Sequence, residues 1–79
     1  MVEPLYKAGK MVWLKELDDL PACKFLIVNV DLTNKSYHGM AFFEFDRETN
    51  TFQAFEPSAN KEGVYAELEW DQVYGETKP

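Results

Sequence analysis

A chain of 79 residues is the size of one domain, and 46% hydrophobic residues, with six Phe, four Tyr and two Trp, are too many for a disordered protein. The net charge is −6, no apolar run approaches the roughly 20 residues that span a bilayer, and the single cysteine, Cys23, excludes an internal disulfide. With no secretory leader in view, we expect one domain, residues 1–79, without membrane contact and in a reducing cytoplasmic compartment.

The negative charge is concentrated in the second half of the chain. Residues 1–40 carry five acidic and five basic side chains, whereas residues 41–79 carry nine acidic and three basic ones. A negative field repels phosphate backbones and attracts basic proteins. We therefore expect no direct nucleic-acid binding and a protein partner, one with a basic surface if the charge itself is recognised. The alternative is that the acidity only serves solubility.

The first predicted strand lies near the N-terminus. Residues 1–9 have no period of their own and form a lead-in that Leu5 and Tyr6 anchor to the body. Residues 10–15 (KMVWLK) form the strand, and its central residues are apolar on both faces. It lies either inside a closed sheet or with one face toward a partner. Residues 16–22 form a polar connection with room for one helical turn before Pro21.

The second predicted strand, residues 23–32 (CKFLIVNVDL), is the most apolar of the chain and should be central. Residues 33–36 form a turn. Gly39 follows early in the next strand and is a candidate for a bulge, because glycine has no side chain to pack. Simple alternation places Leu26, Val28 and Val30 on one face of the second strand and Cys23, Phe25 and Ile27 on the other.

Residues 37–46 and the run that begins at Thr51 predict a β-hairpin. Both segments are rich in aromatic residues, and the loop between them, Arg47–Asn50, is polar and ends in an Asn that tolerates left-handed backbone. A four-residue loop fixes the register, and a slip by one residue would bury polar side chains. The expected cross-strand pairs are Asp46–Thr51, Phe45–Phe52, Glu44–Gln53, Phe43–Ala54 and Phe42–Phe55.

The last part of the chain predicts one helical turn and one strand. Pro57, Ser58, Asn60 and Gly63 indicate a tight helical turn within residues 56–63. Residues 64–71 (VYAELEWD) alternate between apolar and mostly charged positions, which is typical of a half-exposed edge strand. Val73 and Tyr74 pack back on the body, and residues 75–79 form a flexible tail.

Together these elements predict an all-β, mainly antiparallel domain. Five strands, with a tight hairpin in the middle and a helical turn before the last strand, resemble the layout of a small SH3-like barrel in element order alone. The acidic-aromatic motif of peptide-binding SH3 domains is not evident. A curled β-meander or an oligonucleotide-binding-type barrel fits the same order of elements.

The residues that catalysis requires are scarce, so we do not expect an enzyme. His38 is the single histidine, and Cys23 lies in a different predicted strand with no motif around either. One Cys and one His cannot complete a zinc site without carboxylates, and the four glycines are too scattered for a phosphate-binding loop. We expect no metal and no cofactor.

Three functions remain open. The first is a non-enzymatic protein-interaction module with an aromatic surface patch, although the same side chains would equally form a two-sided core. The second is an acidic inhibitor or nucleic-acid mimic that binds a basic protein surface. The third is a structural homodimer. The candidate aromatic patch consists of Trp13, Tyr37, Met40, Phe42 and Phe55, and the candidate acidic face consists of Glu44, Asp46, Glu48, Glu67, Glu69 and Asp71.

Overall fold

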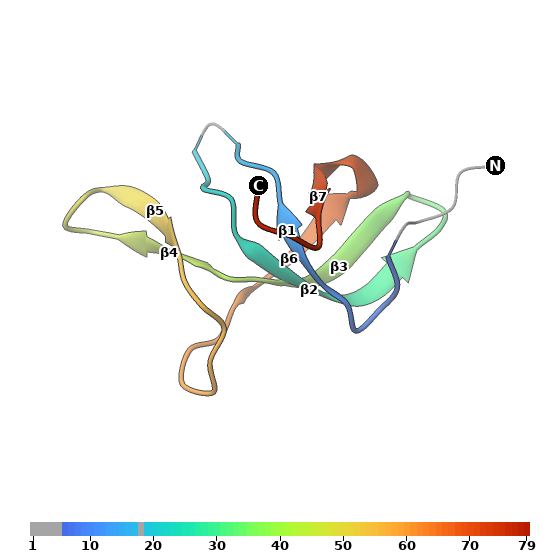
Figure 1. Ribbon diagram of the computed structural model, residues 1–79, viewed down its shortest axis with the longest axis horizontal. Helices are drawn as coiled ribbons and strands as arrows, with labels where there is room; N and C mark the ends of the chain where they lie inside the picture. The colour runs from blue at the N-terminus through green and yellow to red at the C-terminus, as the bar shows by residue number, and fades with distance from the viewer. Residues whose placement is uncertain (1–5, 18) are drawn as a thin grey trace.

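The protein is all-β and antiparallel, as the sequence predicts. A computed structural model describes residues 6–17 and 19–79. Five strands form a curled half-barrel in the order β6-β3-β2-β1-β7, and two more form a small separate sheet (Figure 1). The large sheet comprises β1 (Met11–Leu14), β2 (Lys24–Asp31), β3 (Ser36–Ala41), β6 (Val64–Glu69) and β7 (Val73–Gly75), and the small sheet comprises β4 (Phe43–Asp46) and β5 (Thr51–Ala54).

The core lies on the concave face of the large sheet. Val12 pairs with Phe25, and Phe25 pairs with Ala41, so the three side chains form one buried row across β1, β2 and β3. Tyr6 packs against this core, with its ring centroid 6.5 Å from that of Tyr37, which confirms its role as an anchor of the lead-in. Leu5, the other expected anchor, lies outside the described residues. The buried cluster consists of Val12, Cys23, Phe25, Ile27, Tyr37, Ala41 and Val73.

A bulge in β2 alters the predicted faces of that strand. Ile27 pairs with Gly39 and Asn29 pairs with His38, so Val28 has no opposite residue in β3 and is 55% exposed. The extra residue returns Val30 to the core face, where it packs against the buried cluster. The prediction that Leu26, Val28 and Val30 share one face is therefore wrong, because a bulge shifts the alternation.

The predicted hairpin has the expected register. All four pairs from Asp46–Thr51 to Phe43–Ala54 are present, and Asn50 ends the loop with a left-handed φ of 58°. The expected Phe42–Phe55 pair appears as a hydrogen bond, in which the Phe55 amide donates to the Phe42 carbonyl at 3.2 Å. Loop chemistry and alternation are local properties, so they suffice to set this register.

The predicted continuous strand 37–46 is wrong, because the chain breaks at Phe42 into β3 and β4. The Phe42 amide donates to the Lys24 carbonyl at 3.0 Å, at the end of the large sheet, and the Phe42 carbonyl accepts from Phe55 in the small one. Phe42 is 8% exposed. Phe42 is thus the corner between the two sheets, and the hairpin leaves the body instead of extending the large sheet.

The helical turn lies later in the chain than predicted. Within residues 56–63, Ser58 and Lys61 form an isolated β-bridge and no helix. A 3-10 turn instead spans Trp70–Gln72, so the predicted strand 64–71 ends at Glu69. The Trp70 indole donates to the Ser36 carbonyl at 3.1 Å, and the Glu69 amide donates to Gln72 Oε1 at 2.9 Å. These contacts, one of them to a distant segment, stabilise a turn that alternation alone cannot reveal.

A short strand follows the 3-10 turn. Val73 is buried against the core, as predicted, whereas Tyr74, also expected to pack back, is 53% exposed, because successive side chains of a strand point to opposite faces. β7 pairs with β1 through Leu14–Val73 and Trp13–Gly75. Gly75, which we expected to begin the tail, lies in this strand. The pairing brings the C-terminal segment beside Trp13, and this proximity builds part of the site described next.

Candidate interaction surface

The small sheet projects from the body as an arm, defined here as residues 43–54. In the described part of the chain, neither β4 nor β5 pairs with a strand of the large sheet, and the arm extends to one side of the body (Figure 1). The Phe52 ring makes T-shaped contacts with Phe43 and Phe45, at centroid distances of 5.6 and 5.2 Å. Phe45 is 48% exposed. We name the arm's aromatic face after the side chains that share it: Phe43, Phe45, Phe52 and Ala54.

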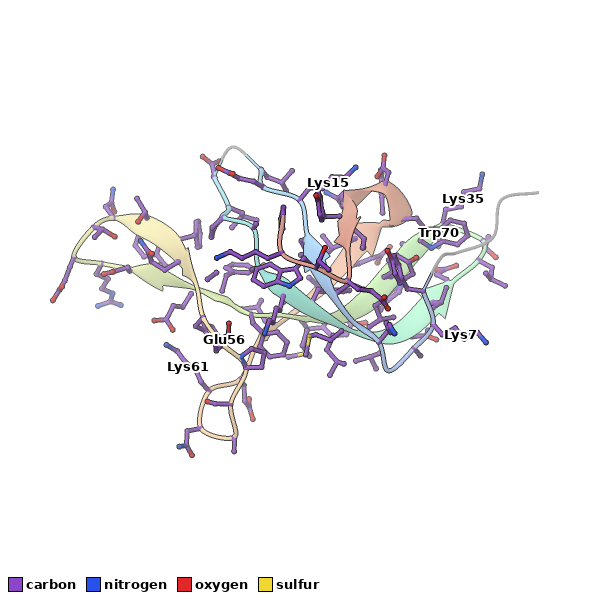
Figure 2. The ribbon with its side chains drawn as sticks, viewed as in Figure 1. Lys7, Lys15, Lys35, Glu56, Lys61 and Trp70 are labelled. Carbon is purple, nitrogen blue, oxygen red and sulfur yellow. The ribbon has the colours of Figure 1, made fainter. Side chains whose placement is uncertain are left out.

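The opposite face of the arm is covered near the body by the loop that follows β5. The Phe42 and Phe55 rings meet edge to face at 6.1 Å, and Lys61 Nζ lies 4.6 Å from the Phe55 ring centroid. Lys61 also forms an ion pair with Glu44. Figure 2 shows Glu56 and Lys61 beside the base of the arm. The two faces therefore differ: Lys61 of this loop contacts the face that carries Glu44 and that continues into Phe42 and Phe55 at the base of the arm.

A small cavity of about 200 Å³ lies where the arm meets the body. Lys24 Nζ is 5.7 Å and Lys78 Nζ is 6.0 Å from the Trp13 ring centroid. Lys24 also pairs with Glu56 at 2.7 Å. The cavity, which we call the Trp13 pocket, is lined by Trp13, Ala22, Lys24, Ala54, Phe55, Glu56 and Lys78.

The five residues of the candidate aromatic patch lie in three different places. Tyr37 and Phe42 are 1% and 8% exposed and belong to the interior. Met40 is on the outer face of the large sheet, opposite the core. Trp13 and Phe55 are half-buried and meet at the Trp13 pocket. Only this last pair lies at one surface site.

The aromatic face of the arm was not among the candidate sites. The alternation of the hairpin predicts that Phe43, Phe45 and Phe52 share a face, and the sequence suggests that this face is the buried one. In the structure Phe43 still packs against the buried cluster, but beyond it the hairpin leaves the body at the corner formed by Phe42, so Phe45 is about half exposed. The sequence signal for this surface is the presence of three phenylalanines on one face of a hairpin. Whether that face is exposed depends on where the chain turns away from the body, which the sequence pattern does not show.

The acidic residues fall into two groups on different sheets. Glu44, Asp46 and Glu48 are on the arm, where Glu44 pairs with Lys61. The other group lies on β6 and the 3-10 turn and comprises Glu67, Glu69 and Asp71. The Asp46 carboxylate accepts a hydrogen bond from the Glu48 amide at 2.9 Å within the arm's own loop. The structure thus divides the candidate acidic face between two elements.

Cys23 and His38 are not brought together. Cys23 is buried on the core side near Phe42, and burial raises the pKa of its thiol, which keeps it protonated at neutral pH. His38 is on the outer face, and its partner in β2, Asn29, lies six residues beyond Cys23, or roughly 20 Å along the strand. The two side chains therefore cannot act as a thiol–imidazole pair.

The surroundings of His38 form a small polar cluster on the outer face. His38 Nδ1 is 3.0 Å from Tyr65 Oη, and His38 Nε2 is 3.9 Å from carboxylate oxygens of both Asp31 and Glu67. Hydrogen bonds from the Asn34 amide and side chain lower the pKa of Asp31. These contacts connect β2, β3 and β6 and are explained by sheet structure alone.

No family model matches the chain. Likewise, no curated protein and no solved structure is significantly similar to it. Across residues 6–17 and 19–79 there is no group of His, Cys, Asp and Glu side chains arranged to hold a metal ion. Within the same residues, no helix has the length and apolar character needed to cross a membrane. Function must therefore be inferred from the geometry of this chain itself.

Proposed function

We propose that this protein is a non-enzymatic interaction module that binds a segment of a partner protein along the aromatic face of the arm. The observation that carries the proposal is the arm's aromatic face, where Phe45 is 48% exposed on a hairpin outside the large sheet. Exposed aromatic rings that gather on one surface are typical of protein-binding sites, where they contribute much of the affinity.

The energetics of the hairpin support the proposal. An isolated two-stranded hairpin is at best marginally stable in water, and an additional covering layer is normally needed. The loop with Lys61 supplies such a layer for one face of the arm, by contact with Phe55 and Glu44. On the aromatic face, a partner segment would bury Phe45 and Phe52 and would stabilise the arm as it binds.

The arrangement of strands supports an SH3-like layout for this module. The order β6-β3-β2-β1-β7 and the 3-10 turn before the last strand are the features that this layout requires. The hairpin arm is then an insertion between the third and fourth strands of the half-barrel. We also propose a reducing cytoplasmic compartment, in which a chain with a single cysteine and no internal disulfide would be typical.

The distribution of charge favours this function over an acidic mimic. A mimic of nucleic acid needs a continuous row of exposed carboxylates, whereas these acidic groups are divided between the arm and β6. Lys61 partly neutralises the group on the arm through Glu44. The aromatic face of the arm, by contrast, consists of uncharged side chains, so a partner can contact it without meeting a carboxylate on that face.

The test is a selection of displayed random peptides on the immobilised protein, followed by affinity measurements on the Phe45→Gln variant. Phe45 is half exposed, so its loss should leave the fold intact while peptide affinity falls by about tenfold or more. Leu32→Gln is the matched control, because Leu32 is 67% exposed in the turn after β2, at the opposite end of the sheet.

Circular dichroism should show the same spectrum for wild type, Phe45→Gln and Leu32→Gln. The proposal is wrong if the wild type selects no peptide, or if selected peptides bind Phe45→Gln as tightly as wild type.

A further inference from the structure

The Trp13 pocket has a local charge opposite to that of the whole protein. The chain carries a net charge of −6, yet two ammonium groups, those of Lys24 and Lys78, lie within 6.0 Å of the Trp13 ring centroid. Lys24 is paired with Glu56 at 2.7 Å. Among residues 6–17 and 19–79, no carboxylate lies within ion-pair distance of Lys78. The pocket therefore has one cation in excess.

The pocket combines this cation with an apolar wall. Trp13 and Phe55 line it together with Ala22 and Ala54, and its volume of about 200 Å³ suits one or two amino-acid side chains. The Lys24–Glu56 pair already places an ammonium–carboxylate contact in this lining. A second carboxylate from outside would give Lys78 the same kind of partner.

The pocket is continuous with the aromatic face of the arm. Ala54 lines the pocket and also pairs with Phe43 on that face. The next pair outward on the same face is Phe45–Phe52, two residues along each strand, or about 7 Å away. An extended partner segment of about four residues can therefore contact Phe45 and reach the pocket at once.

We propose that the Trp13 pocket binds the carboxylate of an Asp or Glu side chain in the partner segment, with an adjacent apolar side chain against Trp13 and the arm. This inference rests on the proposed function and adds the partner's chemistry to it. The ammonium group in excess, that of Lys78, attracts a carboxylate and repels a basic side chain. The partner segment is therefore acidic and apolar at this point, although the protein as a whole is acidic.

The test extends the peptide selection with a double-mutant cycle, in which the charge is removed from the peptide, from the protein or from both. Peptides selected on wild type should be enriched in Asp or Glu beside an aromatic or aliphatic residue. Replacing that acid by its amide should weaken binding about two- to fivefold, the range of a solvent-accessible ion pair. The Lys78→Gln substitution should lower the affinity for the acidic peptide by the same factor and leave the affinity for the amide peptide unchanged.

Lys7→Gln is the matched control for Lys78→Gln, because Lys7 is an exposed lysine at the end of the molecule away from the arm (Figure 2). It should leave both affinities unchanged. A two-dimensional NMR titration should also show the Trp13 indole signal shifting with the acidic peptide.

Two failures are distinguishable. If no peptide is selected, or if binding ignores Phe45→Gln, the proposed function fails and this inference fails with it. If peptides bind through Phe45 but carry no excess of acidic residues, or bind Lys78→Gln as tightly as wild type, only the role of the Trp13 pocket is overturned.

Discussion

At the scale of single residues, Gly39 is where the large sheet leaves least room for a side chain. It pairs with Ile27 at the bulge of β2, and a Cβ built on it would lie 1.9 Å from the Leu26 carbonyl oxygen and 3.0 Å from the Phe25 ring. The first of these neighbours is backbone and cannot rotate away. Gly39 is therefore needed for close approach of β2 and β3, and no left-handed backbone is involved.

We predict that Gly39→Ala lowers the free energy of unfolding by about 1–3 kcal/mol or more, because β2 must move to admit the methyl group. Gly75→Ala is the matched control, since a Cβ there meets only Tyr6 Oη at an ordinary 3.7 Å. That change should be neutral or stabilising by about 0.5–1 kcal/mol. Urea unfolding followed by circular dichroism measures both, and equal stabilities for the two variants would contradict the steric explanation.

At the scale of elements, how far the sequence predicts structure depends on whether the controlling contacts are local. The hairpin register follows from the polar Arg47–Asn50 loop and the alternation beside it, so it is predicted correctly. β3 ends at Ala41, and the corner that follows depends on a hydrogen bond from the Phe42 amide to the Lys24 carbonyl. The 3-10 turn depends on a hydrogen bond from the Trp70 indole to the Ser36 carbonyl. Contacts between distant segments leave no periodic pattern in the sequence, so the corner and the turn could not be predicted from it.

The same difference between local and distant contacts explains which candidate site residues are predicted correctly. Sequence reasoning proposes Trp13 and Phe55 as surface aromatics, and both line the pocket at the base of the arm. It also proposes Tyr37 and Phe42, which are buried, because apolar residues on both faces of a strand do not reveal which face the barrel closes over. The exposure of Phe45 depends on the corner at Phe42, which turns the hairpin away from the core.

The arm should be the least protected part of the sheet structure. It consists of two short strands that, among residues 6–17 and 19–79, pair with each other alone, whereas β2 and β3 each have neighbours on both sides. We predict that backbone amides of β4 and β5 exchange with solvent at least tenfold faster than those of β2 and β3, because an isolated hairpin opens without unfolding the body.

Hydrogen exchange followed by NMR measures this difference. Addition of a selected peptide should slow exchange in the arm and leave exchange in β2 unchanged. Equal protection of the arm and the central strands in the free protein would contradict the prediction.

At the scale of the whole molecule, shape and charge act against each other in self-association. The molecule is 46 Å long and 21 Å thick, and the arm lies at one end of its long axis (Figure 1). The exposed aromatic face favours contact between two arms, whereas a net charge of −6 on each copy opposes it. Which effect dominates depends on the ionic strength, because salt screens charge and leaves apolar contacts intact.

We therefore predict that the chain is monomeric at low salt and that a dimer forms increasingly as salt is added. The Debye length falls from about 30 Å at 0.01 M to about 3 Å at 1 M, so the repulsion between copies is nearly removed over this range. Sedimentation velocity should give the 9.2 kDa monomer at low salt and a growing heavier species at high salt. Phe45→Gln should remain monomeric throughout, since it removes the exposed ring. Association that weakens as salt is added would instead mean that ion pairs between copies hold the dimer.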